Sequence, residues 1–189
     1  MTFRPAAVIL AAGRGERIGT PKHRLVAGDR TFLEVLIRLV RGGGCDPVLC
    51  IVAEEEADRL RTGFGEAVRI VVNPDPARGM LSSLQAGIAV LTDVPGAFVV
   101  PVDHPHIQQA TMGLLMTCAA GQPGVVVKPE YLGRGGHPVY VPAGLFTRIT
   151  QAGTQASLRD VIARSGLPVI RVPVTDEGVV RNVNTVDDL

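Results

Sequence analysis

Short, unbroken apolar runs alternate along this chain with segments whose apolar residues recur every three or four positions. The runs have the length of strands that are buried on both faces of a sheet. They cover residues 8–11, 47–53, 68–72, 96–102 and 124–128. Segments with helical spacing lie between them, at residues 31–42, 54–62 and 108–118. This alternation predicts repeated strand and helix units, which build a mostly parallel sheet.

Local signals mark where these helices begin and end. Thr31 and Glu34 have the spacing of a capping box, and glycines at 42–44 end the helix that follows. Glu54 places an acid in the first turn of the second helix, where the helix dipole favours negative charge. Two prolines make residues 73–79 a loop, which opens onto a further helix.

The last third of the chain predicts helices at residues 143–150 and 157–165 and a strand at 167–174. With 189 residues and 46% hydrophobic content, the chain can fill one core and is too short for two ordinary domains. We therefore expect residues 1–189 to form one domain. Its predicted fold is a three-layer α/β/α sandwich around a Rossmann-like, mostly parallel sheet in which one strand is reversed.

Charge and cysteine content exclude several classes of function. A net charge of +1, without any block of like charges, gives no field for nucleic acid. Cys45, Cys50 and Cys118 form no C-x-x-C pair, so we interpret them as core residues of a protein from a reducing compartment. No apolar run reaches the roughly 20 residues of a membrane span, and no secretory signal is recognisable. We expect a cytoplasmic protein without nucleic-acid or membrane partners.

The loop after the first strand combines glycines, which let backbone N–H groups approach a phosphate closely, with cations that can hold one. The residues concerned are Gly13, Arg14, Gly15, Arg17, Gly19 and Lys22. A P-loop would need Gly directly before Lys22, and a dinucleotide fingerprint would need Gly in place of Ile18, so the loop matches neither. We predict an anion site of another class, with a plain tight turn as the alternative.

The same loop resembles a signature of the MobA-like NTP transferase family, L-x-x-G-x-G-x-R-x-x-x-P-K. Six residues match it: Leu10, Gly13, Gly15, Arg17, Pro21 and Lys22. The resemblance covers residues 5–189 and implies a sheet of the nucleotide-diphospho-sugar transferase type. It further implies that the loop wraps the triphosphate of an incoming nucleotide. Arg17 and Lys22 would then be the catalytic residues, because they stabilise charge as pyrophosphate leaves.

Further residues are expected to contact the nucleotide. Ser82 and Ser83 lie at a predicted helix start, where small hydroxyls can hydrogen-bond a ligand, with N-capping an equal alternative for either serine. Asp103 follows an apolar strand and so lies in the crevice where open α/β sheets bind ligands, with a helix cap as the alternative. The full predicted set is Leu10, Ala11, Ala12, Gly13, Arg14, Gly15, Asn73, Ser82, Ser83 and Asp103.

The resemblance also supplies a metal site. In the family, an acid at the place of Asp103 binds the catalytic Mg²⁺. The terminal sequence R-N-V-N-T-V-D-D-L resembles the end of family members, although Val186 replaces their usual Pro. This implies that Asn182 or Asn184 supplies the second metal ligand, and a turn at the end of a strand is the alternative.

Histidines follow two of the predicted strands. His104 and His106 lie next to Asp103, but the proline between them gives an unfavourable geometry for zinc, so we do not expect a zinc site. His137 belongs to a Gly-His-Pro-Val element that resembles one in the cytidylyltransferases of the family. Gly136 and His137 are therefore predicted to contact the acceptor, with a plain hairpin turn as the alternative.

Nucleotidyl transfer requires no nucleophilic side chain, and the chain has no G-x-S-x-G element. The resemblance is greatest to the molybdenum-cofactor cytidylyltransferases, which have Ala at the place of Ala12 where guanylyltransferases tend to have Gly. We therefore expect a Mg²⁺-dependent enzyme that moves CMP from CTP to a small phosphorylated acceptor, the molybdopterin cofactor, and releases pyrophosphate. A transient contact with a cofactor-accepting enzyme is a further expectation. The alternatives are a guanylyltransferase of the molybdenum cofactor or phospholactate, a methylerythritol-phosphate cytidylyltransferase, and a non-catalytic nucleotide-binding protein.

Overall fold

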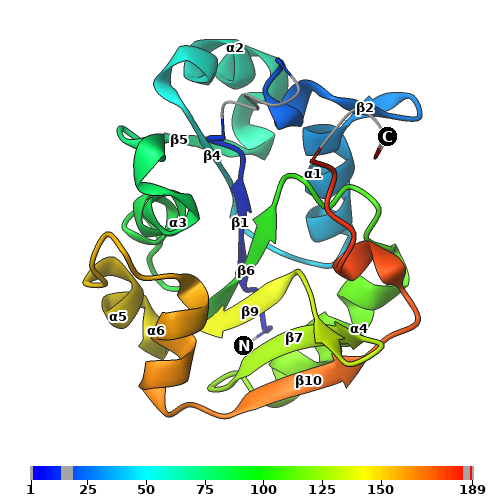
Figure 1. Ribbon diagram of the computed structural model, residues 1–189, viewed down its shortest axis with the longest axis vertical. Helices are drawn as coiled ribbons and strands as arrows, with labels where there is room; N and C mark the ends of the chain where they lie inside the picture. The colour runs from blue at the N-terminus through cyan, green and yellow to red at the C-terminus, as the bar shows by residue number, and fades with distance from the viewer. Residues whose placement is uncertain (1, 14–18, 185–187, 189) are drawn as a thin grey trace.

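The computed structural model describes residues 2–13, 19–184 and 188, and its central feature is a twisted sheet with helices on both faces (Figure 1). The strands pair in the order β10-β7-β9-β6-β1-β4-β5, and β8 attaches to β7. Their bounds are β1 Ala6–Leu10, β4 Val48–Val52, β5 Arg69–Val72, β6 Gly96–Pro101, β7 Val126–Tyr131, β8 Arg134–Gly135, β9 Val139–Pro142 and β10 Val169–Pro173. A separate hairpin joins β2 Val26–Ala27 to β3 Arg30–Thr31.

The helices alternate with these strands, as the sequence predicts. They are α1 Phe32–Gly42, α2 Glu54–Phe64, α3 Met80–Ile88, α4 Gln109–Gly121, α5 Phe146–Thr150 and α6 Leu158–Ser165. Thr31 forms the predicted capping box with Glu34. Short 3-10 turns complete the chain: η1 Lys22–Arg24, η2 Gly65–Ala67, η3 Pro76–Arg78, η4 Ala143–Leu145 and η5 Glu177–Val179.

Strand direction follows the expected pattern. The pairs of β1 with β4, β1 with β6, β4 with β5 and β7 with β10 are all parallel. The expected reversed strand is β9, which is antiparallel to both β6 and β7, and the short β8 is also antiparallel to β7. The sandwich with a mostly parallel sheet is therefore confirmed. The strand predicted at 124–128 runs instead from Val126 to Tyr131, because its end forms a hairpin with β8.

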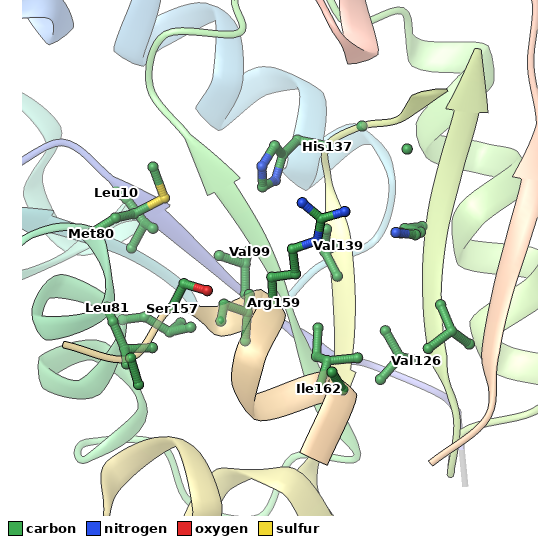
Figure 2. A pocket seen from close by; sticks show the side chains of 18 of the residues that line it. Leu10, Met80, Leu81, Val99, Val126, His137, Val139, Ser157, Arg159 and Ile162 are labelled. Atoms are coloured by element: carbon green, nitrogen blue, oxygen red, sulfur yellow. The ribbon is translucent and has the colours of Figure 1, made fainter. Parts of the chain in front are cut away.

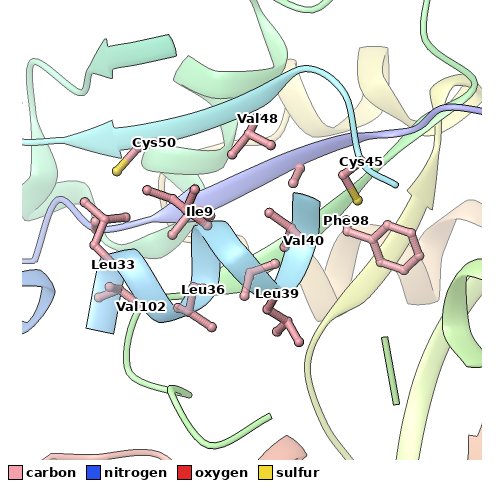
Figure 3. Packing of buried hydrophobic residues seen from close by; sticks show 14 of the residues in the cluster. Ile9, Leu33, Leu36, Leu39, Val40, Cys45, Val48, Cys50, Phe98 and Val102 are labelled. Atoms are coloured by element: carbon pink, nitrogen blue, oxygen red, sulfur yellow. The ribbon is translucent and has the colours of Figure 1, made fainter. Parts of the chain in front are cut away.

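Alternate residues of the central strand β1 fill two separate cores, one on each face of the sheet. Ile9 belongs to the core under α1 and α4, together with Leu36 and Phe98 (Figure 3). Val8 belongs to the core under α3 and α5, together with Leu84. This period of two follows from the pleat of a strand that is covered on both sides. Because both faces of the sheet are buried under helices, the fold has three layers.

Strand register brings two predicted site segments together. Leu10, the last residue of β1, lies opposite Pro101, the last residue of β6. The Val102 N–H donates to the Leu10 carbonyl at 3.0 Å, so Ala11 and Asp103 leave the sheet at the same edge. On the other side, Ala11 N–H donates to the carbonyl of Ile51 at 2.8 Å. The carboxyl ends of three parallel strands therefore frame one crevice.

Close packing also holds α3 against the sheet. A Cβ on Gly87, near the end of this helix, would lie 2.7 Å from Val8 Cγ1 and 2.9 Å from Ile51 Cδ1, so only glycine lets the helix approach the sheet this closely. Cys45 and Cys50 are buried, and burial raises the pKa of each thiol to about 12, as expected for core residues. None of the described helices is long and apolar enough to cross a membrane.

Candidate active site

Three polar side chains from distant parts of the chain meet beyond the ends of β1 and β6. The Lys22 ammonium donates to Asp103 Oδ2 at 3.1 Å and to Asn184 Oδ1 at 2.8 Å. We call these three residues the polar cluster. Sequence analysis predicted Lys22 and Asp103 to be site residues and left Asn182 and Asn184 as alternatives. Of these two asparagines, Asn184 is the one that enters the cluster, whereas Asn182 is exposed.

Asp103 is held from two sides. His104 Nδ1 lies 2.9 Å from Asp103 Oδ1, and the Val183 N–H donates to the Asp103 carbonyl at 2.8 Å. Burial acts to raise the pKa of Asp103, but the hydrogen bond from His104 and the charge of Lys22 outweigh it, so the pKa lies below its ordinary value. The carboxylate is therefore charged at neutral pH and fixed in orientation.

The polar cluster fits a hard divalent cation. One carboxylate oxygen of Asp103 and the amide oxygen of Asn184 converge on a single positive charge, which the Lys22 ammonium supplies here. Carboxylate and amide oxygens are the ligands that Mg²⁺ prefers, and Mg²⁺ commonly uses one or two of them together with substrate phosphates. Among the described residues, no group of three or more His, Cys, Asp or Glu side chains could hold a metal by itself.

The backbone that carries Lys22 is anchored by a buried carboxylate. Glu56 of α2 bonds the two residues that follow Lys22: His23 Nε2 lies 3.0 Å from Glu56 Oε2, and Arg24 Nε donates to the same oxygen at 3.0 Å. Burial acts to raise the pKa of Glu56, but the hydrogen bonds from Arg24 and His23 outweigh it and lower the pKa. Sequence analysis did not identify this anchor, because a Glu in the first turn of a helix is sufficiently explained by the helix dipole.

The predicted serines have different surroundings. Asn73 Nδ2 donates to Ser82 Oγ and to Ser83 Oγ, both at 2.9 Å. Ser82 Oγ also donates to the Gly79 carbonyl at 2.8 Å, so it ties the preceding loop to α3, whose N-cap is Gly79 rather than a serine. Ser83 lines a hollow beside the polar cluster. Nucleotide contacts of Asn73, Ser82 and Ser83 all remain a prediction.

This hollow, which we call the nucleotide cleft, has a volume of about 250 Å³. Its lining includes six of the predicted site residues: Leu10, Ala12, Gly13, Lys22, Ser83 and Asp103. Ala11 lines a smaller adjoining hollow of about 190 Å³, next to His23 and Glu56. Three predicted residues, Arg14, Gly15 and Arg17, lie outside the described residues, so the placement of the phosphate-binding loop stays a prediction.

A second and larger hollow adjoins the nucleotide cleft and shares Leu10, Gly79 and Met80 with it. This large cavity has a volume of about 910 Å³ and is lined by the predicted acceptor residues Gly136 and His137 (Figure 2). The acceptor and hairpin interpretations both fit, because the preceding residues form the β7–β8 hairpin.

Gly136 and His137 contribute to the wall of the large cavity in different ways. Gly136 packs against the Val179 backbone so closely that any Cβ would clash. The His137 ring lies edge-on to His104, with 5.1 Å between ring centroids. Burial, assisted by His104, lowers the pKa of His137 to about 4, so the ring is neutral at pH 7. The wall therefore contains a neutral imidazole, that of His137, whose ring contacts His104, the residue that orients Asp103.

Sequence analysis missed the cations of the large cavity. Lys128 interrupts an otherwise apolar run, which was the available signal, and Arg171 lies in a predicted strand. Both line the cavity, and so does Arg159 from α6. Their proximity depends on strand order and register, which the sequence pattern does not reveal.

The chain is similar in sequence to known proteins. Residues 7–169 match the model of the MobA-like NTP transferase domain. The chain is 31% identical, over 96% of its length and 93% of the relative's, to a nicotine blue oxidoreductase of Paenarthrobacter nicotinovorans. It is 30% identical, over 64% of its length and 59% of the relative's, to a probable molybdenum cofactor guanylyltransferase of Opitutus terrae.

Solved structures have the same fold. Rv0371c of Mycobacterium tuberculosis superposes with a TM-score of 0.81 at 21% identity, covering 100% of this chain and 96% of that one. A manganese complex of the same mycobacterial protein superposes with a TM-score of 0.72 at 20% identity, covering 92% and 89%. With the family model matching most of the chain, from the first strand to the last, this protein belongs to the MobA-like NTP transferase family.

Proposed function

We propose that this protein is a nucleotidyltransferase that moves a nucleoside monophosphate from a nucleoside triphosphate to a small phosphorylated acceptor and releases pyrophosphate. The observation that carries the proposal is the polar cluster, in which a lysine, a carboxylate and an amide converge at the carboxyl edge of the sheet. A non-catalytic nucleotide-binding protein on the same fold could lose the metal ligand or the lysine, whereas Asp103 and Lys22 are both present here. Family membership supports the same class of reaction.

The reaction is an in-line displacement at phosphorus. A phosphate oxygen of the acceptor forms a bond to the α-phosphorus, and the bond from that phosphorus to the bridging oxygen of pyrophosphate breaks. Arg17 and the loop amides hold the β- and γ-phosphates, and Lys22 neutralises charge on the α-phosphate. Asp103 and Asn184 would hold Mg²⁺, whose chemistry when bound is neutralisation and polarisation of phosphate oxygens. His104 keeps the Asp103 carboxylate turned toward the cluster.

For the donor we propose CTP. The Ala12 methyl group lines the nucleotide cleft and takes up room there, which favours the smaller pyrimidine ring over a purine. A site whose polar groups are left unpaired by the wrong base discriminates strongly. The molybdopterin cofactor is the proposed acceptor, because the relative from Opitutus terrae is named for the molybdenum cofactor. That relative is also named a guanylyltransferase, so GTP is the competing donor.

A second candidate function is an oxidoreductase that acts on an aromatic substrate. It is favoured by the relative named nicotine blue oxidoreductase, which matches nearly the whole length of both chains. A cleft that binds the phosphates of a nucleotide can also bind the diphosphate of a dinucleotide cofactor, and the large cavity, with a volume of about 910 Å³, has room for an organic substrate. The polar cluster has no evident part in such a reaction, which makes it the weaker candidate.

The test offers the purified protein Mg²⁺, molybdopterin cofactor and either CTP or GTP, and measures pyrophosphate release. We expect release that requires both acceptor and metal and is faster with CTP. The variant Ala12→Gly should narrow the preference for CTP by about tenfold, which corresponds to about 1.4 kcal/mol. Faster release with GTP would reject the donor assignment and keep the reaction class. Reduction of nicotine blue by reduced nicotinamide dinucleotide, without pyrophosphate release, would establish the second candidate instead.

A further inference from the structure

The large cavity collects positive charge on its walls. Five cationic side chains line it: Arg78, Lys128, Arg134, Arg159 and Arg171. None of the other described residues that line it is an Asp or a Glu. The net charge of the whole chain is only +1, so this concentration is local and does not reflect a basic protein. The cavity therefore attracts anions.

Strand register and one helix place three of these cations together. Lys128 on β7 lies directly opposite Arg171 on β10 in the parallel register. Val126, two residues before Lys128, also lines the cavity, so this face of β7 is directed into it. Arg159 comes from α6 and lies over the same hollow as Val126 and Ile162 (Figure 2). We call Lys128, Arg159 and Arg171 the cation group.

The charges of the cation group are incompletely balanced. Burial lowers the pKa of Lys128, and the charges of Arg171 and Arg159 lower it further, so the three cations repel one another. Arg171 donates to Glu130 at 2.8 Å. Within residues 2–13, 19–184 and 188, no salt bridge joins Lys128 or Arg159 to a carboxylate. Like charges at short range destabilise the folded protein unless a counter-charge is present, so the arrangement is the one expected of an anion site.

The floor between the cation group and the nucleotide cleft is apolar. It is formed by Leu10, Leu81, Val99, Val139 and Ile162, which surround the hollow in Figure 2. A volume of about 910 Å³ is far more than one phosphate needs. An apolar floor that ends at several cations suits a ligand with a ring-shaped or aliphatic body and an anionic group at its end.

We propose that the cation group is a subsite for a second oxyanion of the acceptor, a carboxylate or a phosphate carried at the end remote from the group that reacts. The proposal rests on the proposed function only in taking the bound molecule to be the acceptor, and it favours an acceptor with a second anionic group over molybdopterin, whose one phosphate is the group that reacts. The large cavity and the nucleotide cleft share Leu10 and Met80, so one molecule can extend from the cation group to the polar cluster. Two guanidinium forks beside an ammonium provide both direction and charge for an oxyanion.

The probe for this subsite is 1-anilinonaphthalene-8-sulfonate, which joins a ring system to one oxyanion and fluoresces when its rings leave water. Neutral N-phenyl-1-naphthylamine has similar rings without the charge. Both are titrated without added phosphate or pyrophosphate, because either anion would compete for the cation group. We expect Lys128→Met and Arg159→Met each to weaken the charged probe about tenfold, which corresponds to about 1.4 kcal/mol, and to leave the neutral probe unchanged.

Arg148→Met is the matched control, because Arg148 is an exposed arginine of α5 that does not line the cavity. It should leave both probes unchanged. Equal losses for the charged and neutral probes, or losses as large in Arg148→Met, would overturn the subsite. Displacement of the charged probe by 1-naphthyl phosphate or by 1-naphthoate identifies the preferred oxyanion, and displacement by neither would also overturn the proposal.

A stability measurement separates ligand binding from a structural part in the fold. Lys128→Met removes a cation that its neighbours repel, so the variant should have an equal or higher thermal midpoint without anion. A lower midpoint would assign Lys128 to the fold and overturn the proposal. Because binding is measured without turnover, the two hypotheses fail separately: intact probe binding without nucleotidyl transfer would reject the proposed function alone.

Discussion

The two hollows of this active site differ in how their charges are balanced. Beside the nucleotide cleft, Lys22 bonds Asp103 and Asn184, and the residues after Lys22 bond the buried Glu56. In the large cavity, the charged groups among the described residues that act on Lys128 are the cations Arg159 and Arg171 and the carboxylate of Glu130, which already bonds Arg171. Internal bonding fixes the groups that act on phosphate before any ligand arrives. In the large cavity, the unbalanced positive charge requires an anionic ligand to neutralise it. Specificity for the acceptor would therefore lie in this cavity.

The largest effect should come from the carboxylate of the nucleotide side. Asp103→Asn keeps the shape of the side chain and removes the charge, which weakens both the metal ligand and the pairing with Lys22. We expect pyrophosphate release to fall by about a thousandfold or more, on the order of 4 kcal/mol of barrier. Circular dichroism should show an unchanged fold, and activity within tenfold of the parent would show that the metal binds elsewhere.

Lys22→Met sharpens the comparison because it removes a catalytic charge and leaves the bond between Asp103 and His104 in place. Loss of one contact that stabilises transition-state charge typically costs about 2 to 4 kcal/mol of barrier. The free energy of unfolding should fall by less than the barrier rises, at most about 2 kcal/mol, because the Lys22 and Asp103 side chains are only 20% and 19% exposed but Asp103 keeps its hydrogen bond to His104. Steady-state pyrophosphate release and urea unfolding measure the two quantities. A stability loss that matches the activity loss would make Lys22 a structural residue.

His137, in the wall of the large cavity, should make stability depend on pH. Its pKa in the folded protein is about 4, below the ordinary value of 6.5, so the unfolded chain binds a proton first as the pH falls. Its contribution is therefore present above pH 6.5 and is lost between pH 6.5 and 4, by up to about 3 kcal/mol. His137→Gln should flatten the pH dependence of urea unfolding in this window. An unchanged slope would show that His137 does not cause it.

Glu56→Gln tests whether the nucleotide side depends on its anchor. The amide cannot bond His23 and Arg24 as a carboxylate does, so stability should fall by about 1 to 3 kcal/mol. If Glu56 positions Lys22, kcat should also fall about tenfold while KM stays nearly constant. Glu54→Gln, in the same turn of α2 but exposed, is the matched control and should change neither. Normal kcat in a destabilised Glu56→Gln protein would restrict the anchor to folding.

Sequence patterns predicted the parts of the site that depend on local signals. Apolar runs located β1 and β6, and the rule for open sheets then placed Asp103 at the crevice. Asn184 required the family resemblance, because no local pattern brings residues 162 positions apart into contact. The opposition of Lys128 and Arg171 could not be predicted, since it depends on β10 pairing with β7 in one particular register.

The most direct test of nucleotidyl transfer is mass spectrometry of the acceptor after a single turnover. The protein, in excess over molybdopterin cofactor, is incubated with Mg²⁺ and CTP, and in a parallel sample with GTP. The account predicts a product in which the acceptor carries one covalently linked nucleoside monophosphate, CMP in preference to GMP, and no such product with Asp103→Asn. Absence of any nucleotidylated product with both donors would contradict it.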